Sequence, residues 1–378
     1  MKKALIITTI GGFLPQFLHN DVKALKTKGY EIHYASDFEN TVYFFDPESL
    51  ERDGIHLHSC LIKKSPRRII RNIRAAVELA DLIKREEIDL VHCHNPVGGI
   101  VGRLAAVLSG KKVKVIYTAH GFHFFDGAPF YYWLLFYPVE RIAARFTDVI
   151  ITINSEDFRR AKGFKLKKGG KVFHMHSVGI DTGRFFPNKS INPQVRNELN
   201  IPDDAFHLVT AAELNKNKNH IVVLKALEIL RDEEIYYSIC GEGMGRGFLE
   251  QYIREHGLAD RVHLTGYRYD MERVLQSADV FLFPSIREGF GMAPVEAMSC
   301  SVPVIASDNR GTREYMQDRE NGIVVKTMQP EDYAAAITAI KQDKELCEFY
   351  GENAYTGSRK FSRQEGEILM ESVYEYID

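Results

Sequence analysis

Short apolar runs alternate with amphipathic stretches along almost the whole chain. The runs have the length and composition of strands buried on both faces of a parallel sheet, and the stretches between them have helical periodicity. In the N-terminal half we expect strands over residues 4–10, 31–36, 55–60, 89–94, 114–119, 148–154 and 171–177, and helices over 20–28, 67–84, 97–108 and 155–161. This βα alternation predicts a doubly wound α/β sheet.

The same pattern restarts after a stretch rich in Gly, Pro and Asn at 181–202, which we interpret as a linker. Strands are expected at 207–213, 262–266, 280–285, 302–307 and 322–326, with helices over 294–299 and from Gly311. A length of 378 residues suits two domains. We therefore predict domains over 1–185 and 186–360, followed by a terminal helix over 361–378.

Two glutamates, Glu288 and Glu296, flank a glycine-containing loop between a strand and a helix. Pro294 favours a helix start, which would place Glu296 in the first turn, where the helix dipole stabilises a carboxylate. The alternative is functional: Glu296 accepts hydrogen bonds from a ribose diol, and free N–H groups beside it bind phosphate. The spacing alone does not decide between them.

The segments EGFGMAPVEAM, VPVIAS and GTRE closely resemble the donor-site signature of retaining glycosyltransferases of family 4. The resemblance covers nearly the whole chain. It implies the GT-B fold, in which two Rossmann-like domains face a central cleft and the C-terminal helix crosses back to the first domain. It also implies that Glu296 holds the ribose of a nucleotide sugar and that Glu288 lies by the transferred sugar. Backbone contacts to the sugar and phosphate would come from Gly289, Phe290, Gly291, Met292 and Ala293.

The resemblance assigns further donor-side residues. His120 of an H-G pair at a strand end would contact a sugar hydroxyl, and Lys218 would neutralise the diphosphate. Where the family usually has an arginine five residues before that lysine, this chain has Glu213, so Lys216 is a candidate to share the role. Arg310 stands where a glycine is commoner. The Gly11-Gly12 pair after the first strand either lets the backbone approach a phosphate closely or is a mere tight turn. The remaining donor-side candidates are Asn215, Gly241, Tyr267 and Arg268.

A basic stretch and an aromatic stretch mark the N-terminal half. Residues 63–74 carry six cations and no acid, with three isoleucines at helical spacing: Lys63, Lys64, Arg67, Arg68, Arg71 and Arg74 with Ile69, Ile70 and Ile73. This segment is either the solvated face of a core helix or a patch that rests on anionic lipid. Nucleic acid is disfavoured because no nucleic-acid-binding motif accompanies the patch.

The aromatic stretch, residues 117–137, holds eight Phe and Tyr after His120 and the only tryptophan, Trp133. It predicts either core or the wall of an acceptor site, with His123 and Asp126 as acceptor-side candidates. His92 and His94 alternate along a strand, and a zinc interpretation lacks partners for them. We expect no metal and no cofactor, since the family is generally metal-independent.

Composition fits a globular chain, and five scattered cysteines indicate a reducing compartment. Residues 1–185 carry 28 Lys and Arg against 19 Asp and Glu, a net of +9, whereas residues 186–378 carry 21 against 32, a net of −11. No apolar run is long enough to cross a membrane. We therefore expect a cytoplasmic protein that is peripheral at the inner face of the cell membrane.

The stretches YTAHGFHFF, PVGG and ELNKNKNH further resemble bacterial exopolysaccharide and capsule enzymes, which build sugars on polyprenyl-diphosphate carriers. The predicted activity is retaining transfer of a hexose or N-acetylhexosamine from a nucleotide sugar, with UDP expected, to a lipid-linked or glycan acceptor. The rivals are a UDP-sugar 2-epimerase of the same fold, a non-catalytic nucleotide-sugar-binding subunit, and a glycosidase that uses Glu288 and Glu296.

Overall fold

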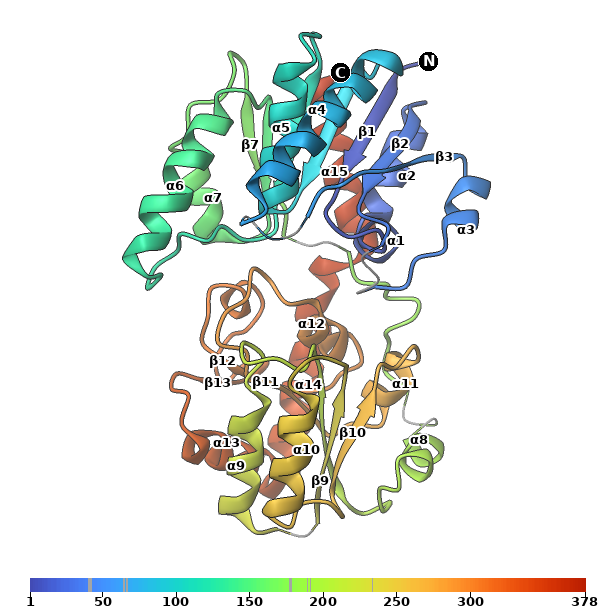
Figure 1. Cartoon of the computed structure of the whole chain (residues 1–378). Coiled ribbons are helices and arrows are strands. Elements are labelled where there is room, and N and C mark those ends of the chain that lie inside the picture. The colour runs from blue at the N-terminus through green and yellow to red at the C-terminus, as the bar shows by residue number, and fades with distance from the viewer. Residues whose placement is uncertain are drawn as a thin grey trace. The chain divides into compact units, whose positions relative to one another are not determined.

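The chain forms two compact units, one of Met1–Gly179 with Arg363–Asp378 and one of Ile180–Ser362 (Figure 1). The computed structural model describes residues 1–39, 43–63, 65, 67–176, 179–188, 190, 192–232 and 234–378. The last 16 residues of the chain thus belong to the first unit although they follow the second unit in sequence, as the resemblance implied for the last helix.

A seven-stranded parallel sheet forms the centre of the first unit. Its strands are β1 (Lys3–Ile7), β2 (Glu31–Ser36), β3 (Ile55–Ser59), β4 (Leu90–His94), β5 (Lys114–Ala119), β6 (Val149–Thr152) and β7 (Lys171–His174), in the spatial order β3-β2-β1-β4-β5-β6-β7. All seven predicted strands are confirmed. Several end earlier than expected, because polar loops begin at their carboxyl ends.

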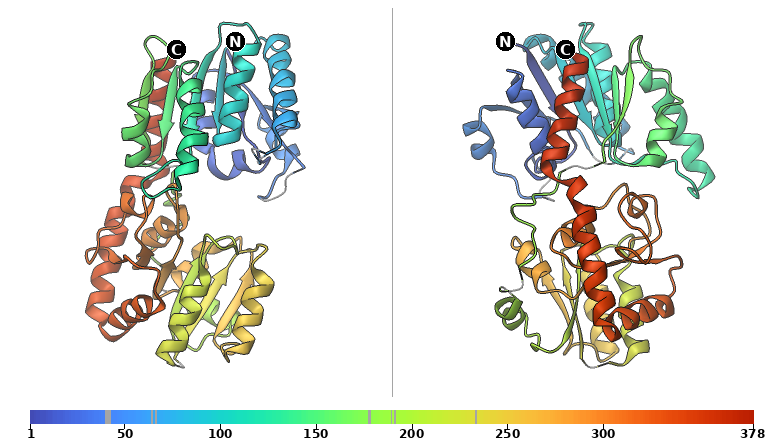
Figure 2. Two further views of the ribbon diagram at one scale, coloured as in Figure 1. Left: turned by 60° about the vertical axis from the view of Figure 1, so that its left-hand side comes forward. Right: turned by 180° about the vertical axis from the view of Figure 1, so that it is seen from behind.

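Helices cover both faces of this sheet. On one face α5 (Pro96–Leu108) packs against α4 (Ile69–Arg85) and α6 (Phe130–Ala144). On the other face α15 (Arg363–Ile377) packs along α2 (His19–Thr27), as the rear view in Figure 2 shows. The shorter helices are α1 (Phe13–Phe17), α3 (Pro47–Arg52) and α7 (Ser155–Ala161). Residues 130–137 of the aromatic stretch form the first half of α6, a helix that was not predicted, while the residues before them end β5 and form the loop between the two elements.

The second unit repeats the design with six parallel strands. They are β8 (Phe206–Ala211), β9 (Ile235–Cys240), β10 (Val262–Gly266), β11 (Val280–Phe283), β12 (Val304–Ser307) and β13 (Gly322–Val325), in the order β10-β9-β8-β11-β12-β13. Their helices are α8 (Asn192–Glu198), α9 (His220–Leu230), α10 (Arg246–Glu255), α11 (Met271–Gln276), α12 (Met292–Ser299), α13 (Pro330–Gln342) and α14 (Lys344–Ser358). The prediction of two Rossmann-like α/β units is confirmed.

The helix expected from Gly311 is wrong. Only a 3₁₀ turn, Thr312–Glu314, forms there. The Asn309 side chain accepts hydrogen bonds from the N–H groups of Gly311 and Thr312, at 3.0 and 3.1 Å, and the Thr312 hydroxyl donates to the Ser307 carbonyl at 2.7 Å. These side-chain bonds replace the helical ladder and close a tight turn instead.

Each sheet has one point at which the strand order reverses. It lies between β1 and β4 in the first unit and between β8 and β11 in the second. Open α/β sheets bind ligands in the crevice outside the carboxyl ends of the strands at this switch point. The loops that follow these four strands are therefore the places where each unit can hold a ligand.

Candidate active site

The loops after β8 and β11 are tied together at the switch point of the second unit. The Ile286 N–H donates to the Asn217 carbonyl at 2.8 Å, and the Asn217 amide donates to the Arg287 carbonyl at 2.9 Å. Next to these bonds, Lys218 Nζ lies 2.7 Å from Glu288 Oε1. Two candidates that are 70 residues apart thus form one ion pair.

Close backbone approach holds the Glu288 loop against the loop after β12. A Cβ on Gly311 would lie 2.7 Å from the Phe290 carbonyl oxygen and 2.8 Å from Glu288 Cβ, so glycine is needed there. Arg310 donates from Nε to the Glu288 carbonyl at 3.3 Å. The residue that departs from the family glycine therefore places a second cation at the loop of Glu288.

Glycines also bring the loop after β9 against the loop after β8. A Cβ on Gly241 would lie 2.0 Å from the Ala212 carbonyl oxygen, and one on Gly243 or Gly245 would collide with Leu214. The supported loop includes Asn215, whose side chain accepts from the Lys218 N–H at 3.1 Å. Gly241 and Asn215 thus lie in the framework that positions Lys218.

Lys216 and Glu213 lie on the same loop and are exposed. The backbone carbonyl of Glu213 is hydrogen-bonded with His220 Nε2, at 3.3 Å, at the start of α9. Cations on this loop and on the Glu288 loop that it contacts include Lys216, Lys218 and Arg287, and Arg310 reaches the Glu288 carbonyl from the loop after β12.

Glu296 lies two residues further into its helix than expected, because the helix starts at Met292 and not at Pro294. Gly291, with φ +88°, permits a turn that starts α12 at Met292, so Glu296 is the fifth residue and the first turn has no acid. The simple explanation that Glu296 stabilises a helix N-terminus is therefore wrong. Pro294 is the third residue of α12. It is tolerated there because the first four N–H groups of a helix have no helical partner, so the N–H group that proline lacks is not needed.

Burial raises the pKa of Glu296 to about 7, a rise that Arg184 opposes and Glu272 adds to. Sequence reasoning missed both neighbours. The Arg184 guanidinium donates from Nε to Glu272 at 2.7 Å. Arg184 belongs to the linker, and no pattern in the sequence indicates that the linker returns to α12.

Tyr267 and Arg268 follow β10 at the same end of the sheet. The pKa of Tyr267 is raised, first by burial and then by the nearby Tyr269 and Glu296, so Tyr267 and Glu296 are neighbours. Arg268 binds Asp270 through two hydrogen bonds of 2.8 and 2.7 Å. Its guanidinium is thus committed within the protein, which leaves its backbone as the group expected to contact a base.

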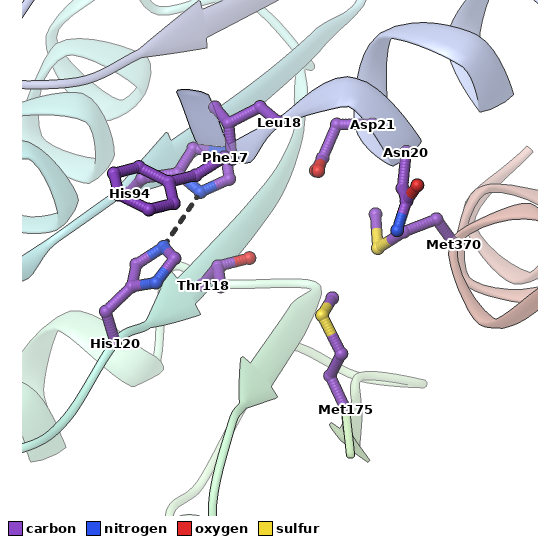
Figure 3. A pocket seen from close by; sticks show the side chains of 9 residues that line it. All are labelled: Phe17, Leu18, Asn20, Asp21, His94, Thr118, His120, Met175 and Met370. Carbon is purple, nitrogen blue, oxygen red and sulfur yellow. Dashed lines mark hydrogen bonds between the residues drawn. The ribbon is translucent and has the colours of Figure 1, made fainter. Parts of the chain in front are cut away.

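In the first unit, His120 and His94 lie at the carboxyl ends of neighbouring strands β5 and β4. Their Nε2 and Nδ1 atoms are 3.3 Å apart, within a hydrogen bond (Figure 3). They line a cavity of about 10 Å³, enough for one water molecule, together with Phe17, Leu18, Asn20, Asp21, Thr118, Met175 and Met370. Burial lowers the pKa of His120 to about 4, so its imidazole is neutral at physiological pH.

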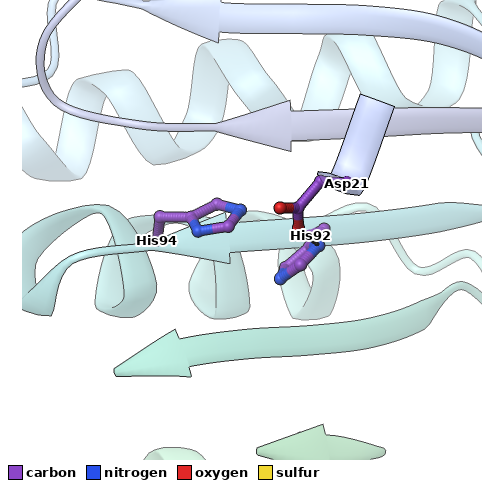
Figure 4. Close-up of side chains that lie close together, drawn as sticks. All are labelled: Asp21, His92 and His94. Carbon is purple, nitrogen blue, oxygen red and sulfur yellow. Dashed lines mark ion pairs between the residues drawn. The ribbon is translucent and has the colours of Figure 1, made fainter. Parts of the chain in front are cut away.

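His92 and His94 do have a third ligand-type neighbour, contrary to the expectation from the sequence. Asp21 of α2 lies 3.3 Å from His92 Nδ1 (Figure 4). However, His92 Nδ1 also pairs with the Tyr374 hydroxyl, and His92 Nε2 pairs with Thr118, both at 2.8 Å. The group is a buried hydrogen-bond network that ties α15 and α2 to the sheet below His94.

Gly11 and Gly12 follow β1, and the protein's own chain occupies the space beside them. A Cβ on Gly12 would lie 2.6 Å from the Phe44 carbonyl oxygen and 2.7 Å from Tyr43 Cβ, and one on Gly11 would touch Phe38. Tight packing therefore accounts for both glycines in this structure.

The acceptor-side candidates His123 and Asp126 lie on the segment that joins β5 to α6, and Trp133 lies in the first turn of α6. His123 stacks on Phe136, with ring centroids 4.5 Å apart. The Arg160 guanidinium forms an ion pair of 2.6 Å with Asp126 and lies 4.6 Å from the Trp133 ring. Asp126 and Trp133 are thus held by one cation.

The cations of the basic stretch differ in their pairing and exposure. Lys63 forms an ion pair with Asp37 at 2.7 Å, and Lys64 lies outside the described residues. The other four cations are exposed, and so are the three isoleucines: Arg67, Arg68, Arg71 and Arg74 with Ile69, Ile70 and Ile73. This exposure fits both the solvated helix face and the lipid-facing patch, because later residues of α4 such as Ala75 and Leu79 pack in the core. Among the described helices, none is both long and apolar enough to cross a membrane.

Two family models match the two halves of the chain. The model described as "Glycosyl transferase 4-like" matches residues 13–154, and the one described as "Glycosyl transferases group 1" matches residues 192–357. The second match includes Lys218, Glu288 and Glu296.

Among curated proteins, the chain is 35% identical to "Putative glycosyltransferase EpsD" of Bacillus subtilis, over 100% of this chain and 97% of that protein. It is 26% identical to an Escherichia coli "UDP-Gal:alpha-D-GlcNAc-diphosphoundecaprenol alpha-1,3-galactosyltransferase", over 74% of this chain and 73% of that protein.

Solved structures agree on the fold. Anabaena Alr3699/HepE, in complex with UDP and glucose, superposes with a TM-score of 0.82 at 17% identity, over 99% of this chain and 100% of that one. WaaG, a glycosyltransferase involved in lipopolysaccharide biosynthesis, reaches 0.76 at 16%, over 98% and 99%. The chain is therefore a member of the group 1, family 4-like glycosyltransferases with the GT-B fold, and its enzyme class is that of the hexosyltransferases.

Proposed function

We propose that the protein transfers a hexose or N-acetylhexosamine, with retention of configuration, from a UDP sugar to a lipid-linked or glycan acceptor in cell-surface polysaccharide synthesis. The observation that carries this proposal is the meeting of Lys218 and Glu288 at the switch point of the second unit. Burial raises the pKa of Glu296 to about 7, and such strongly shifted carboxyl groups are typical of functional sites, which supports a ligand-binding role for Glu296.

The donor diphosphate would lie at Lys218. Before the donor binds, Glu288 neutralises Lys218 and fixes its position, so little reorganisation is needed when the phosphate arrives. The N–H groups at the start of α12 add positive potential. Lys216 and Arg310 supply charge where Glu213 replaces the family's arginine.

The ribose and base would lie at Glu296 and Tyr267. An ionised carboxylate can accept hydrogen bonds from both hydroxyls of a ribose. Tyr267 beside it leaves about half of its side chain exposed, with its ring centroid 5.0 Å from that of Tyr269. The sugar itself would lie toward Glu288, with His120 of the first unit contacting a hydroxyl.

Chemistry then needs no side-chain base. The bond between the anomeric carbon and the diphosphate oxygen breaks, and the acceptor oxygen bonds to that carbon from the same face. The acceptor proton passes to the departing phosphate oxygen, which gives nucleoside diphosphate and glycoside. Lys218 and the N–H groups of α12 stabilise the charge that develops on the leaving group.

The acceptor would be carried by a polyprenyl diphosphate, the kind of acceptor named for the Escherichia coli relative. The protein would be cytoplasmic and would rest on the inner face of the membrane through Arg67, Arg68, Arg71 and Arg74, which are exposed around the start of α4. Each cation near an anionic surface contributes about 1 kcal/mol. Changing all four to Ser should therefore release the protein from anionic vesicles, and persistent binding would contradict this placement.

A panel of nucleotide sugars, tested without acceptor, separates the rival functions. We expect one UDP sugar to raise the thermal stability and to be hydrolysed slowly to UDP and free sugar. Return of an epimerised sugar nucleotide would favour the 2-epimerase. A second round with a lipid-linked acceptor added identifies the non-catalytic subunit, which would bind the nucleotide sugar without turnover. If no nucleotide sugar binds, the donor site built on Glu296 is wrong.

A further inference from the structure

Helix α6 presents an apolar face that none of the described residues of the first unit covers. Phe130, Leu134 and Leu135 are 80%, 64% and 59% exposed, and Ile142 is 58% exposed. Tyr131 and Val139 extend the same stripe. Soluble monomers rarely expose a contiguous stripe of this kind, and such patches mark interaction sites.

The opposite face of α6 is held firmly, so the exposed face cannot turn inward. Trp133, Phe136 and Tyr137 pack against the core of the first unit. Glu140, the only acid of α6, is buried and accepts a hydrogen bond of 2.8 Å from Arg103 of α5. The helix is thus apolar on both sides, one side being filled by the protein.

Charge on the exposed face has one sign. Because Glu140 is buried, the exposed charges at α6 are Arg141 and, at its C-terminal cap, Arg145. The first turns of α4, on the same face of the sheet, combine exposed Ile70 and Ile73 with arginines. Within α6 this gives an apolar stripe with basic groups and no exposed acid, and the exposed Asp126 just before the helix is paired with Arg160. Such a stripe fits an anionic lipid surface better than a protein surface, which mixes both signs.

Topology places this face near the candidate site. Both α4 and α6 follow strands of the parallel sheet, so both begin at the carboxyl edge, where His94 and His120 lie. Phe130, Leu134 and Leu135 occupy the first half of α6 and are therefore nearest to that edge.

We propose that α6 lies in the plane of an anionic bilayer, with Phe130, Leu134, Leu135 and Ile142 inserted among the acyl chains. The arginines at the start of α4 attract the protein to anionic headgroups, and the apolar side chains of α6 insert into the bilayer. This proposal extends the proposed membrane placement and rests on a separate observation, because α6 takes no part in donor binding. It brings the carboxyl edge of the first unit to the depth at which a polyprenyl diphosphate presents its sugar.

The test is sedimentation of the full chain with vesicles of phosphatidylglycerol and phosphatidylcholine. The variant L134S/L135S should lower the partition constant at least about tenfold, because two large apolar side chains no longer leave water on binding. The matched control I229S/F349S, which removes two exposed apolar side chains of the second unit, should change it less than about twofold. Equal effects of the two variants would overturn the proposal.

Insertion depth gives an independent readout. A tryptophan in place of Leu134, in a W133F background, should be quenched by lipids brominated on their acyl chains, whereas one in place of Ile229 should not. Absence of quenching at 134 would overturn the proposal. So would a dimer in light scattering that L134S/L135S dissociates without a change in vesicle binding, since the face would then bind a second copy. Binding of the UDP sugar by wild type and by L134S/L135S is measured in parallel. If the UDP sugar binds both proteins but neither vesicle prediction holds, the membrane proposal fails and the proposed donor site does not.

Discussion

The carboxylate of Glu296 should make donor binding depend on pH in a way that a glutamine cannot reproduce. Its pKa is about 7 in the free protein, because the side chain is partly buried. The ionised form can accept hydrogen bonds from both ribose hydroxyls, while an amide offers a single acceptor oxygen. Hydrogen bonds to a charged group contribute about 1.5–3 kcal/mol. E296Q should thus weaken UDP-sugar binding roughly 10- to 150-fold at pH 8.

Below pH 7 the wild type should lose this advantage. Donor binding favours the ionised carboxylate, so affinity falls about tenfold for each unit of pH below the pKa and levels off near the affinity of the variant. The diphosphate of a UDP sugar carries no group that titrates in this range. Isothermal titration at pH 8, 7, 6 and 5.5 should therefore give two curves that converge as the pH falls.

The same substitution should stabilise the ligand-free protein at pH 8. The folded state binds the Glu296 proton more tightly than the unfolded state, so ionisation of this carboxyl above pH 7 destabilises the fold. The difference between 4.5 and about 7 corresponds to at most roughly 3–4 kcal/mol at about 1.4 kcal/mol per pKa unit. Equal donor affinity of wild type and E296Q at pH 8, or a flat wild-type pH profile, would refute the assigned role.

Three other substitutions test neighbouring parts of the account. K218A should lower kcat on the order of 10²-fold in steady-state kinetics, through loss of one group that stabilises the leaving diphosphate, and K225A, an exposed lysine of α9, should change it little. H94L should lower kcat in wild type but add nothing in an H120A background, while H94N, which keeps a hydrogen-bonding group near the position of Nδ1, should restore part of the loss. Additive effects of the two substitutions would contradict a role of His94 in positioning His120. E140Q should destabilise the first unit by about 3–5 kcal/mol in urea unfolding, because its buried guanidinium partner loses its counter-charge; a smaller loss than about 1 kcal/mol would show that the pair is not needed.

Alternating apolar runs were sufficient to predict both sheets. Strands buried on two faces are continuous apolar segments, and segments of helical periodicity separate them. The existence of each strand can therefore be predicted from its local sequence. Helix starts were less predictable. The start of α12 depends on the positive φ of Gly291, and the helix expected from Gly311 is replaced by side-chain bonds from Asn309, neither of which has a periodic signal.

The candidate site was predictable only where its residues lie in one motif. Glu288 and Glu296 could be found from the loop that joins β11 to α12, and Lys218 from the resemblance. Arg184 and Glu272 could not, because they reach Glu296 through the folding of the linker and α11 rather than through nearby sequence. The aromatic stretch was ambiguous for a similar reason, since α6 is apolar on both faces and its sequence does not indicate which side is buried.

The central claim is retaining transfer from a nucleotide sugar, and the anomeric configuration of the product tests it most directly. The protein would be incubated with the UDP sugar identified from the panel and a short-chain polyprenyl-diphosphate sugar in anionic vesicles, and the new linkage would be read from its proton coupling by nuclear magnetic resonance. The account predicts an α-linked product from the α-configured donor, formed by wild type and strongly reduced in K218A. A β-linked product, or consumption of the donor that K218A leaves unchanged, would contradict it.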